Sequence, residues 1–144
     1  MFSKSCEYGI RASLYIAQQS QLNKRSGIKD IAKGIDSPVA YTAKILQQLV
    51  KHRIVNSIKG PSGGFGINIS DLDSIKLSHI VSAIDGNSIY NGCGLGLKAC
   101  NALKPCPMHE SFTSIRNDLK KMLETTSLKL LVSGLDTGLT FLKR

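Results

Sequence analysis

The chain has 144 residues and a formal net charge of +9. This length predicts a single domain with a sizeable core, or a small domain with an arm. No apolar run approaches the roughly 20 residues that a membrane-spanning helix needs. The first residues, Met1–Glu7, contain no apolar signal region. We therefore expect a cytoplasmic protein with reduced thiols and no membrane partner.

The positive charge is concentrated in the first part of the chain. Residues 1–60 contain ten Lys and Arg against three Asp and Glu, whereas residues 61–144 contain nine against seven. Such an asymmetry is typical of a polyanion-binding module joined to a second, near-neutral part.

Apolar residues at helical spacing predict three helices near the start of the chain. The first covers residues 3–19, and its apolar arc is so wide that it should contact more than one neighbour. A short helix over residues 28–34 follows a polar turn. Ser37 and Pro38 then open a helix that runs to about Lys51, because Ser is a good N-cap and Pro is tolerated at the first helical position. The second and third helices form a helix-turn-helix.

The third predicted helix has a polar and basic outer face opposite its apolar stripe. In a helix-turn-helix, this helix enters the major groove, where Lys and Gln supply donors for base edges. We therefore expect DNA contacts from five residues of this face: Tyr41, Lys44, Gln47, Gln48 and Lys51. Taken alone, the pattern would be better explained as an ordinary solvated helix face, and the hairpin that follows is what favours DNA binding.

A β-hairpin is predicted directly after this helix. Residues 54–58 and 65–69 alternate like half-buried strands, and a Gly/Pro turn joins them. A hairpin in this position is a wing, which lies along the DNA backbone or enters the minor groove. Lys59 would meet phosphate, and small residues allow close approach to the backbone. The expected wing contacts are Lys59, Ser62, Gly63 and Gly64.

Three of the four cysteines lie in one Gly-rich loop, after a short helix expected at His79–Asp85. They are Cys93, Cys100 and Cys106, and His109 follows closely. Cysteine is usually buried, so three in a loop indicate a bonding partner. Thiolates are soft ligands for zinc and for iron–sulfur clusters. Because the loop lacks the tight cysteine pairs of most structural zinc sites, we favour an iron–sulfur cluster and keep zinc as the alternative.

A longer helix is predicted from about Pro107. Its apolar residues are separated by steps of four, three, four and three, as in a heptad seam. They are Met108, Phe112, Ile115, Leu119 and Met122. Because the preceding elements already complete a winged domain, we expect this helix to mediate a homodimer. A last short helix begins at Ser127 and ends near Gly134.

These elements predict a mostly α fold with a small β-hairpin, in which a winged helix-turn-helix domain is joined to a long dimerisation helix. The expected division is a DNA-binding domain at residues 1–86, a cysteine-rich cluster-binding loop at 87–109, and the dimerisation helix with a C-terminal helix and tail at 110–144.

The chain resembles the bacterial winged-helix repressors of the IscR/NsrR/CymR family, up to about residue 133. Besides the cysteine loop, four segments carry the resemblance: Tyr8-Gly-Ile-Arg-Ala12, Tyr41-x-x-Lys-Ile-Leu-x-x-Leu49, Lys59-Gly-Pro-Ser-Gly-Gly-Phe65 and Ile80-Val-Ser-Ala-Ile-Asp85. The resemblance implies a homodimeric transcription regulator. It also implies that Cys93, Cys100 and Cys106 ligate a [2Fe–2S] or [4Fe–4S] cluster.

The resemblance leaves the fourth ligand open. His109 matches the histidine ligand of IscR-like members, and Glu7 matches an acidic ligand that NsrR-like members take from the partner subunit. Cys6 is a further candidate beside Glu7, although we expect it to be a small buried apolar residue. Six residues separate Cys93 from Cys100, where many relatives have five, so cluster type and loop geometry stay open.

The sequence therefore predicts a transcriptional regulator, and a repressor in particular, that binds a double-stranded DNA operator. Its affinity would be switched by an iron–sulfur cluster that senses cluster supply, nitric oxide or redox state. The alternatives are a winged-helix regulator with structural zinc or thiol-based sensing, and a small iron–sulfur electron-transfer protein. We expect no enzyme and no small-molecule substrate, because the histidines are scattered at His52, His79 and His109.

Overall fold

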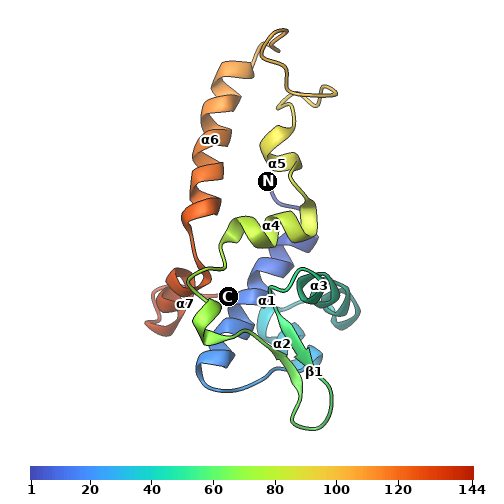
Figure 1. Cartoon of the computed structure of the whole chain (residues 1–144), viewed down its shortest axis with the longest axis vertical. Coiled ribbons are helices and arrows are strands. Elements are labelled where there is room, and N and C mark those ends of the chain that lie inside the picture. Colours follow the sequence, from blue (N-terminus) through green and yellow to red (C-terminus); the bar gives the residue numbers. More distant parts are fainter.

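A computed structural model describes all 144 residues. It contains seven α-helices, a two-stranded antiparallel sheet and one 3-10 turn (Figure 1). In chain order the elements are α1 (Lys4–Gln21), α2 (Ile28–Ile35), α3 (Val39–Lys51), β1 (Asn56–Ile58), β2 (Gly64–Gly66), η1 (Ile69–Asp71), α4 (Leu77–Asp85), α5 (Ser88–Asn91), α6 (His109–Thr125) and α7 (Leu128–Asp136). No helix is both long enough and apolar enough to cross a membrane.

The molecule has two parts, which Figure 1 separates clearly. The body comprises residues 1–85 and 126–144 and contains α1 to α4, the hairpin and α7. The arm comprises residues 86–125 and contains α5, the cysteine loop and α6, which extend together away from the body (Figure 1).

Helix α1 is the centre of the body. It contacts α2, α3, α4 and α7, as its wide apolar arc predicts. Ile16 and Ala17 of α1 are fully buried, together with Ile31 of α2 and Leu46 and Leu49 of α3. Close packing of this kind makes α1 the scaffold on which the helix-turn-helix is built.

The start of α3 differs from the sequence expectation. Pro38, and not Ser37, occupies the N-cap position, and no side chain caps the helix. The Ser37 hydroxyl instead shares a hydrogen bond with the Thr42 hydroxyl. The Thr42 hydroxyl also donates to the Pro38 carbonyl at 2.8 Å, and this satisfied hydroxyl is fully buried. Val39, the first residue of the helix, is exposed although it is apolar.

The hairpin strands are shorter than predicted. Asn56, Ser57 and Ile58 pair with Gly66, Phe65 and Gly64 in antiparallel register. The alternation extends further in sequence because Ile54, Val55 and Ile67 are buried in the body core rather than paired in the sheet. Burial of side chains on one face gives the same alternating pattern as a longer strand.

The remaining boundaries follow local capping. Helix α4 begins at Leu77, two residues before the predicted start at His79, and Lys76 occupies its N-cap position. Ser127 caps α7, as the sequence predicts, because its hydroxyl accepts from the Leu130 N–H at 3.1 Å. The single-turn helix α5 is a feature that the sequence pattern did not predict.

Candidate nucleic-acid interface and cysteine loop

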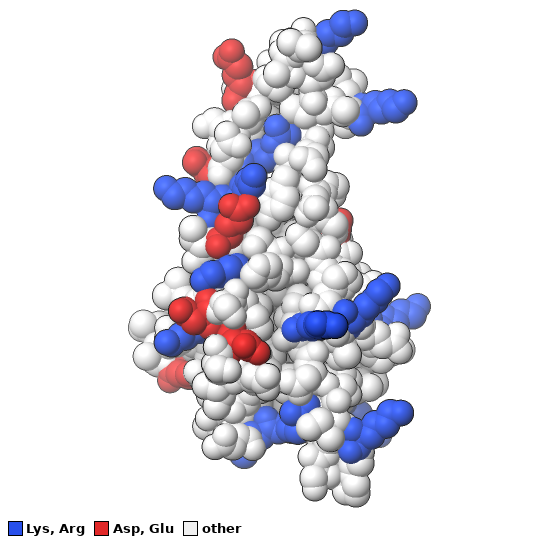
Figure 2. All heavy atoms as spheres, viewed as in Figure 1, with Lys and Arg blue, Asp and Glu red and all other residues white.

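Four of the five residues predicted to contact DNA from α3 are exposed in the structure. They are Lys44, Gln47, Gln48 and Lys51. The only ion pair in the chain joins Lys4 and Glu7 at 3.3 Å, so the Lys44 and Lys51 ammonium groups have no carboxylate partner. Figure 2 shows Lys and Arg side chains projecting around α3 and the hairpin, whereas on the side of α6 and α7 Asp and Glu are interleaved with Lys and Arg. This distribution suits a phosphate-rich partner for α3.

Tyr41, the fifth residue, has a different environment. It is half-buried, and its ring packs edge-on against Tyr8 of α1 with centroids 5.4 Å apart. Its hydroxyl shares a hydrogen bond with the Ser5 hydroxyl. Tyr41 therefore anchors the first turn of α3 on α1 in the free protein, a role that the exposed-face pattern did not indicate.

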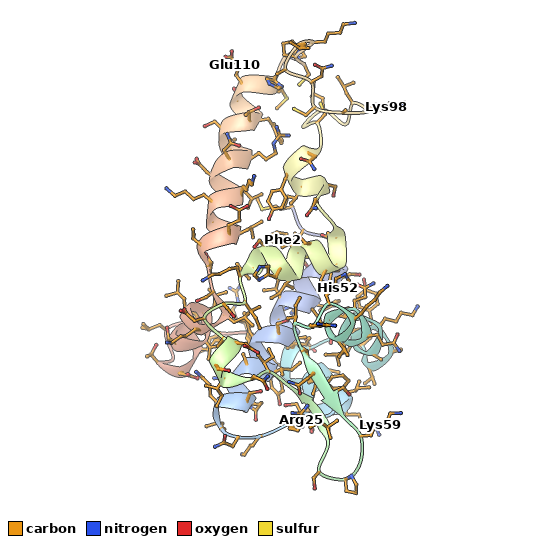
Figure 3. The ribbon with its side chains drawn as sticks, in the orientation of Figure 1. Phe2, Arg25, His52, Lys59, Lys98 and Glu110 are labelled. Carbon is orange, nitrogen blue, oxygen red and sulfur yellow. The ribbon has the colours of Figure 1, made fainter.

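The predicted wing residues lie at the free end of the hairpin. Lys59 and Ser62 are exposed, while Gly63 and Gly64 are half-buried. Figure 3 labels Lys59 on the hairpin, away from the rest of the body. Like the α3 lysines, Lys59 has no carboxylate partner. The wing thus presents an unpaired, exposed cation directly after β1.

In the cysteine loop, Cys93 lies in a turn whose backbone favours its thiolate. The N–H groups of Leu95 and Leu97 lower the pKa of Cys93. Burial opposes this effect, and the Cys106 thiol and the Gly96 N–H add to it. A thiolate is the form of cysteine that binds metals. Cys93, with the Cys106 thiol as its neighbour, is therefore the first pair of donors.

Cys100 and His109 form a second pair. The Cys100 sulfur lies 3.5 Å from His109 Nδ1 and 3.3 Å from Arg116 Nη2. Arg116 also donates from Nη1 to the Gly92 carbonyl at 2.6 Å. Arg116 therefore fastens the start and the middle of the loop to α6. No sequence pattern marks Arg116, although it lies seven residues after His109 and so on the same face of α6.

The residues fit an iron–sulfur cluster by their chemistry, since three thiols and an imidazole share one loop region. In the conformation described, no three His, Cys, Asp or Glu side chains come together in a single metal-binding group. Ligation by all the donors thus requires the two pairs, Cys93/Cys106 and Cys100/His109, to approach each other.

The two candidate ligands on α1 are unlike each other. Cys6 is fully buried, and this burial, followed by the effect of the Asp85 carboxylate, raises the pKa of its thiol to about 12. A neutral, enclosed thiol is a poor metal ligand, in agreement with the expectation of a small buried apolar residue. Glu7 is exposed on the first turn of α1 and pairs with Lys4.

The predicted dimerisation residues form an apolar seam along α6. Ile115 is 62% exposed, and Met108, Phe112 and Met122 are also exposed, while Leu119 is half-buried. Leu123 is the only fully buried residue of α6. A groove of about 360 Å³ runs beside the seam, and Ile89, Phe112, Ile115 and Leu119 contribute its apolar lining.

The helix-turn-helix, the hairpin that follows it and the basic face define a winged-helix transcription regulator. The chain belongs to the Rrf2 family, described as iron-dependent transcriptional regulators, which matches residues 2–134. This membership confirms the predictions of a DNA-binding transcription regulator and of a protein that is not an enzyme.

Known relatives support the same assignment. The chain is 28% identical over 136 residues to a provisionally named HTH-type transcriptional regulator of Aquifex aeolicus, covering 92% of each chain. It is 26% identical over 130 residues to the regulator IscR of Escherichia coli, covering 88% of this chain and 76% of IscR. The solved structure of CymR, the global cysteine regulator of B. subtilis, has a TM-score of 0.78 at 22% identity, with 92% of this chain and 96% of CymR covered. This likeness confirms the predicted fold class.

Proposed function

We propose that this chain is a homodimeric regulator whose affinity for a double-stranded DNA operator is switched by an iron–sulfur cluster on the cysteine loop. The observation that carries the proposal is the attachment of this loop. Arg116 and His109 of α6 contact Cys100, and Arg116 also bonds Gly92 at the start of the loop, whereas the basic face that would meet DNA is on the body. Sensing and DNA binding would thus occupy separate parts, in line with a division at residues 1–86, 87–109 and 110–144.

The DNA interface consists of the exposed face of α3 and the wing. Lys44, Gln47 and Gln48 would contact base edges, and Lys51 and Lys59 would contact phosphates. Ser62, Gly63 and Gly64 would bring the wing close to the DNA backbone. The absence of carboxylate partners for the lysines supports this, because their charge is available to replace condensed counterions.

Cys93, Cys100 and Cys106 would hold the cluster. Its bound form would supply a centre that responds to iron–sulfur supply, nitric oxide or redox state. His109 is favoured as fourth ligand over Glu7 of the partner subunit, because His109 Nδ1 already lies 3.5 Å from the Cys100 sulfur. Arg116 contacts Cys100 and Gly92 together, so a change of charge or position at Cys100 is passed to α6.

The homodimer would form along the apolar seam. A row of exposed apolar side chains on α6, beside a groove with an apolar lining, leaves a surface that a second copy would cover. A shift of α6 would then alter the spacing of the two winged bodies, and half-site spacing is a geometric condition for dimers on DNA.

The test is a metal analysis of protein purified without oxygen. Iron, acid-labile sulfide and zinc are counted together with the absorption spectrum, for the wild type and for Cys93→Ser, Cys100→Ser and Cys106→Ser. Cys6→Ser is the matched control. We expect brown wild-type and Cys6→Ser protein with near-equal iron and sulfide, and colourless loop variants that remain folded. Loop variants that keep full iron and sulfide would contradict the ligand assignment, and one zinc per colourless wild-type chain would make the loop structural.

A second pair of variants addresses the fourth ligand. His109→Ala should lose its cluster faster than the wild type during exposure to air, whereas Glu7→Gln should match the wild type. The opposite result would assign the ligand to Glu7 of the partner subunit.

A further inference from the structure

Arg25, in the connector between α1 and α2, is bonded to both strands of the wing. Its Nε donates to the Gly64 carbonyl at 3.1 Å, and its Nη2 donates to the same carbonyl at 3.0 Å. Nη2 also donates to the Asn56 carbonyl at 3.2 Å and to the Asn56 side-chain oxygen. Figure 3 shows Arg25 and Lys59 on opposite sides of the hairpin.

Ser26, the residue after Arg25, forms an antiparallel β-bridge with Phe65 of the wing. The Ser26 N–H donates to the Phe65 carbonyl at 2.9 Å, and the Phe65 N–H donates to the Ser26 carbonyl at 2.8 Å. The connector and the hairpin are therefore joined by backbone as well as by the guanidinium group.

Two glycines leave the room that this attachment needs. A Cβ atom at Gly66 would lie 2.8 Å from Arg25 Nη1. A Cβ atom at Gly64 would lie 2.8 Å from the Ser26 carbonyl oxygen, and Gly64 has a φ of +120°. A side chain at Gly64 would thus collide with the connector backbone, and one at Gly66 would displace the Arg25 guanidinium. Gly64 also adopts a conformation that other residues rarely reach.

We infer that Arg25 is a positioning residue of the DNA interface, which fixes the angle of the wing relative to α3. A hairpin with three-residue strands is marginally stable by itself and needs an anchor. Arg25 supplies it, because a planar guanidinium can bond two carbonyls at once and a lysine ammonium lacks that fork. Its Nε and Nη2 donors are already used within the protein, so Arg25 acts through Lys59 rather than on phosphate. This inference rests on the proposed function of the wing.

The test uses a DNA duplex selected from a random pool by the wild-type protein, with binding followed by fluorescence anisotropy at several salt concentrations. Arg25→Lys keeps the charge and loses the fork. Lys59→Ala removes the proposed phosphate contact, and the double variant combines the two changes. Lys24→Gln is the matched control, since it removes a neighbouring exposed charge whose side chain forms no hydrogen bond or ion pair with the wing.

Arg25→Lys and Lys59→Ala should each weaken binding roughly tenfold, which corresponds to one hydrogen bond to a charged group. Each should also reduce the steepness with which the logarithm of the binding constant falls with the logarithm of salt concentration by about 0.9, the value for one phosphate contact. The double variant should bind no more weakly than Lys59→Ala alone, and Lys24→Gln should keep the wild-type slope. Additive losses, or wild-type affinity in Arg25→Lys, would overturn the inference.

Hydrogen exchange in the free protein gives a readout that does not depend on DNA. The Phe65 N–H should exchange faster in Arg25→Lys, while amides of α1 are unchanged. Unchanged exchange at Phe65 would overturn the anchoring role even where DNA affinity falls. A wild-type protein that selects no duplex would instead contradict the proposed function, and the exchange result would still decide whether Arg25 holds the hairpin.

Discussion

The body and the arm of this protein differ in how far their apolar side chains are buried by the chain itself. Nearly the whole apolar core belongs to the body, with helices α1 to α4 and α7 packed around one another. In the arm, no residue from Gly86 to Met122 is buried, although several are large and apolar. The body can be explained from its own contacts, whereas the arm presents thiols and apolar side chains that its own chain does not cover.

Hydrogen bonds within the body fix the two points at which the arm begins and ends. Asp85, the last residue of α4, accepts hydrogen bonds from the Ser3 N–H at 3.1 Å and from the Ser3 hydroxyl. At the other end of the arm, the Leu77 N–H donates to the Thr126 carbonyl at 3.0 Å. The two points at which the arm leaves the body are thus held beside α1 and α4, which both contact α3.

Truncation of a core side chain should show the largest effect. Leu46→Ala in the body should lower the free energy of unfolding by about 2–5 kcal/mol, because it leaves a cavity among fully buried neighbours. Ile115→Ala in the arm should change it by less than about 1 kcal/mol in the monomer, as an exposed substitution does. Urea unfolding at low protein concentration measures both. Equal losses would mean that the arm has a core of its own.

A charge on the apolar seam should break the dimer. Ile115→Asp should weaken self-association by roughly 30-fold or more, the effect of losing a buried interface anchor of about 2 kcal/mol. Sedimentation equilibrium measures the change. Leu130→Asp on α7 is the control, since Leu130 is also 62% exposed and lies off the seam. A dimer that survives Ile115→Asp and dissociates in Leu130→Asp would place the interface on α7.

Alkylation of thiols should distinguish the two parts residue by residue. In cluster-free native protein, iodoacetamide should label Cys93, Cys100 and Cys106, which are all partly exposed. Cys6 should react at least roughly a hundredfold more slowly, because its thiol is buried and must be exposed by opening of the body. Peptide mass spectrometry follows each site. Comparable labelling of Cys6 would show that α1 and α4 separate readily.

The smallest expected effect is on the pH dependence of stability. Burial raises the pKa of Cys6 from 9.0 to about 12, so the folded protein retains this proton at a pH where the unfolded chain loses it. The contribution of the protonated Cys6 thiol to the free energy of unfolding is therefore fully present below pH 9. It is lost as the pH rises from 9 toward 12. At pH 10 the loss should be about 1 kcal/mol. Thermal unfolding of the wild type and Cys6→Ala should show a steeper alkaline decline in the wild type, and parallel curves would contradict the buried thiol.

The sequence predicts the body well because its signals are local. Apolar spacing locates α1 and α3 to within a few residues, and the Ser127 cap marks the start of α7 correctly. The Gly/Pro turn identifies the wing. The predicted hairpin strands are too long because Ile54 and Ile67 are apolar and buried, as strand residues often are, although they do not pair in the sheet.

The contacts of the candidate sites could not be predicted in the same way. Tyr41 lies on the outer side of its helix by spacing, and only the position of Tyr8 shows that it packs inward. Arg25 and Arg116 bond to segments 39 and 16 residues away, at Gly64 and Cys100. Such contacts depend on the tertiary arrangement, and no periodic pattern marks them. The ligand assignments and the DNA contacts stay predictions.

The central claim is that the state of the loop in the arm controls DNA binding by the body. The most direct measurement is the affinity of cluster-loaded and chelator-stripped wild-type protein for one selected duplex, at a single salt concentration. Our account predicts dissociation constants that differ by at least roughly tenfold, within the usual range of coupling between two sites. Cys93→Ser protein should have one affinity under both treatments. Equal affinities of loaded and stripped wild-type protein would contradict the account.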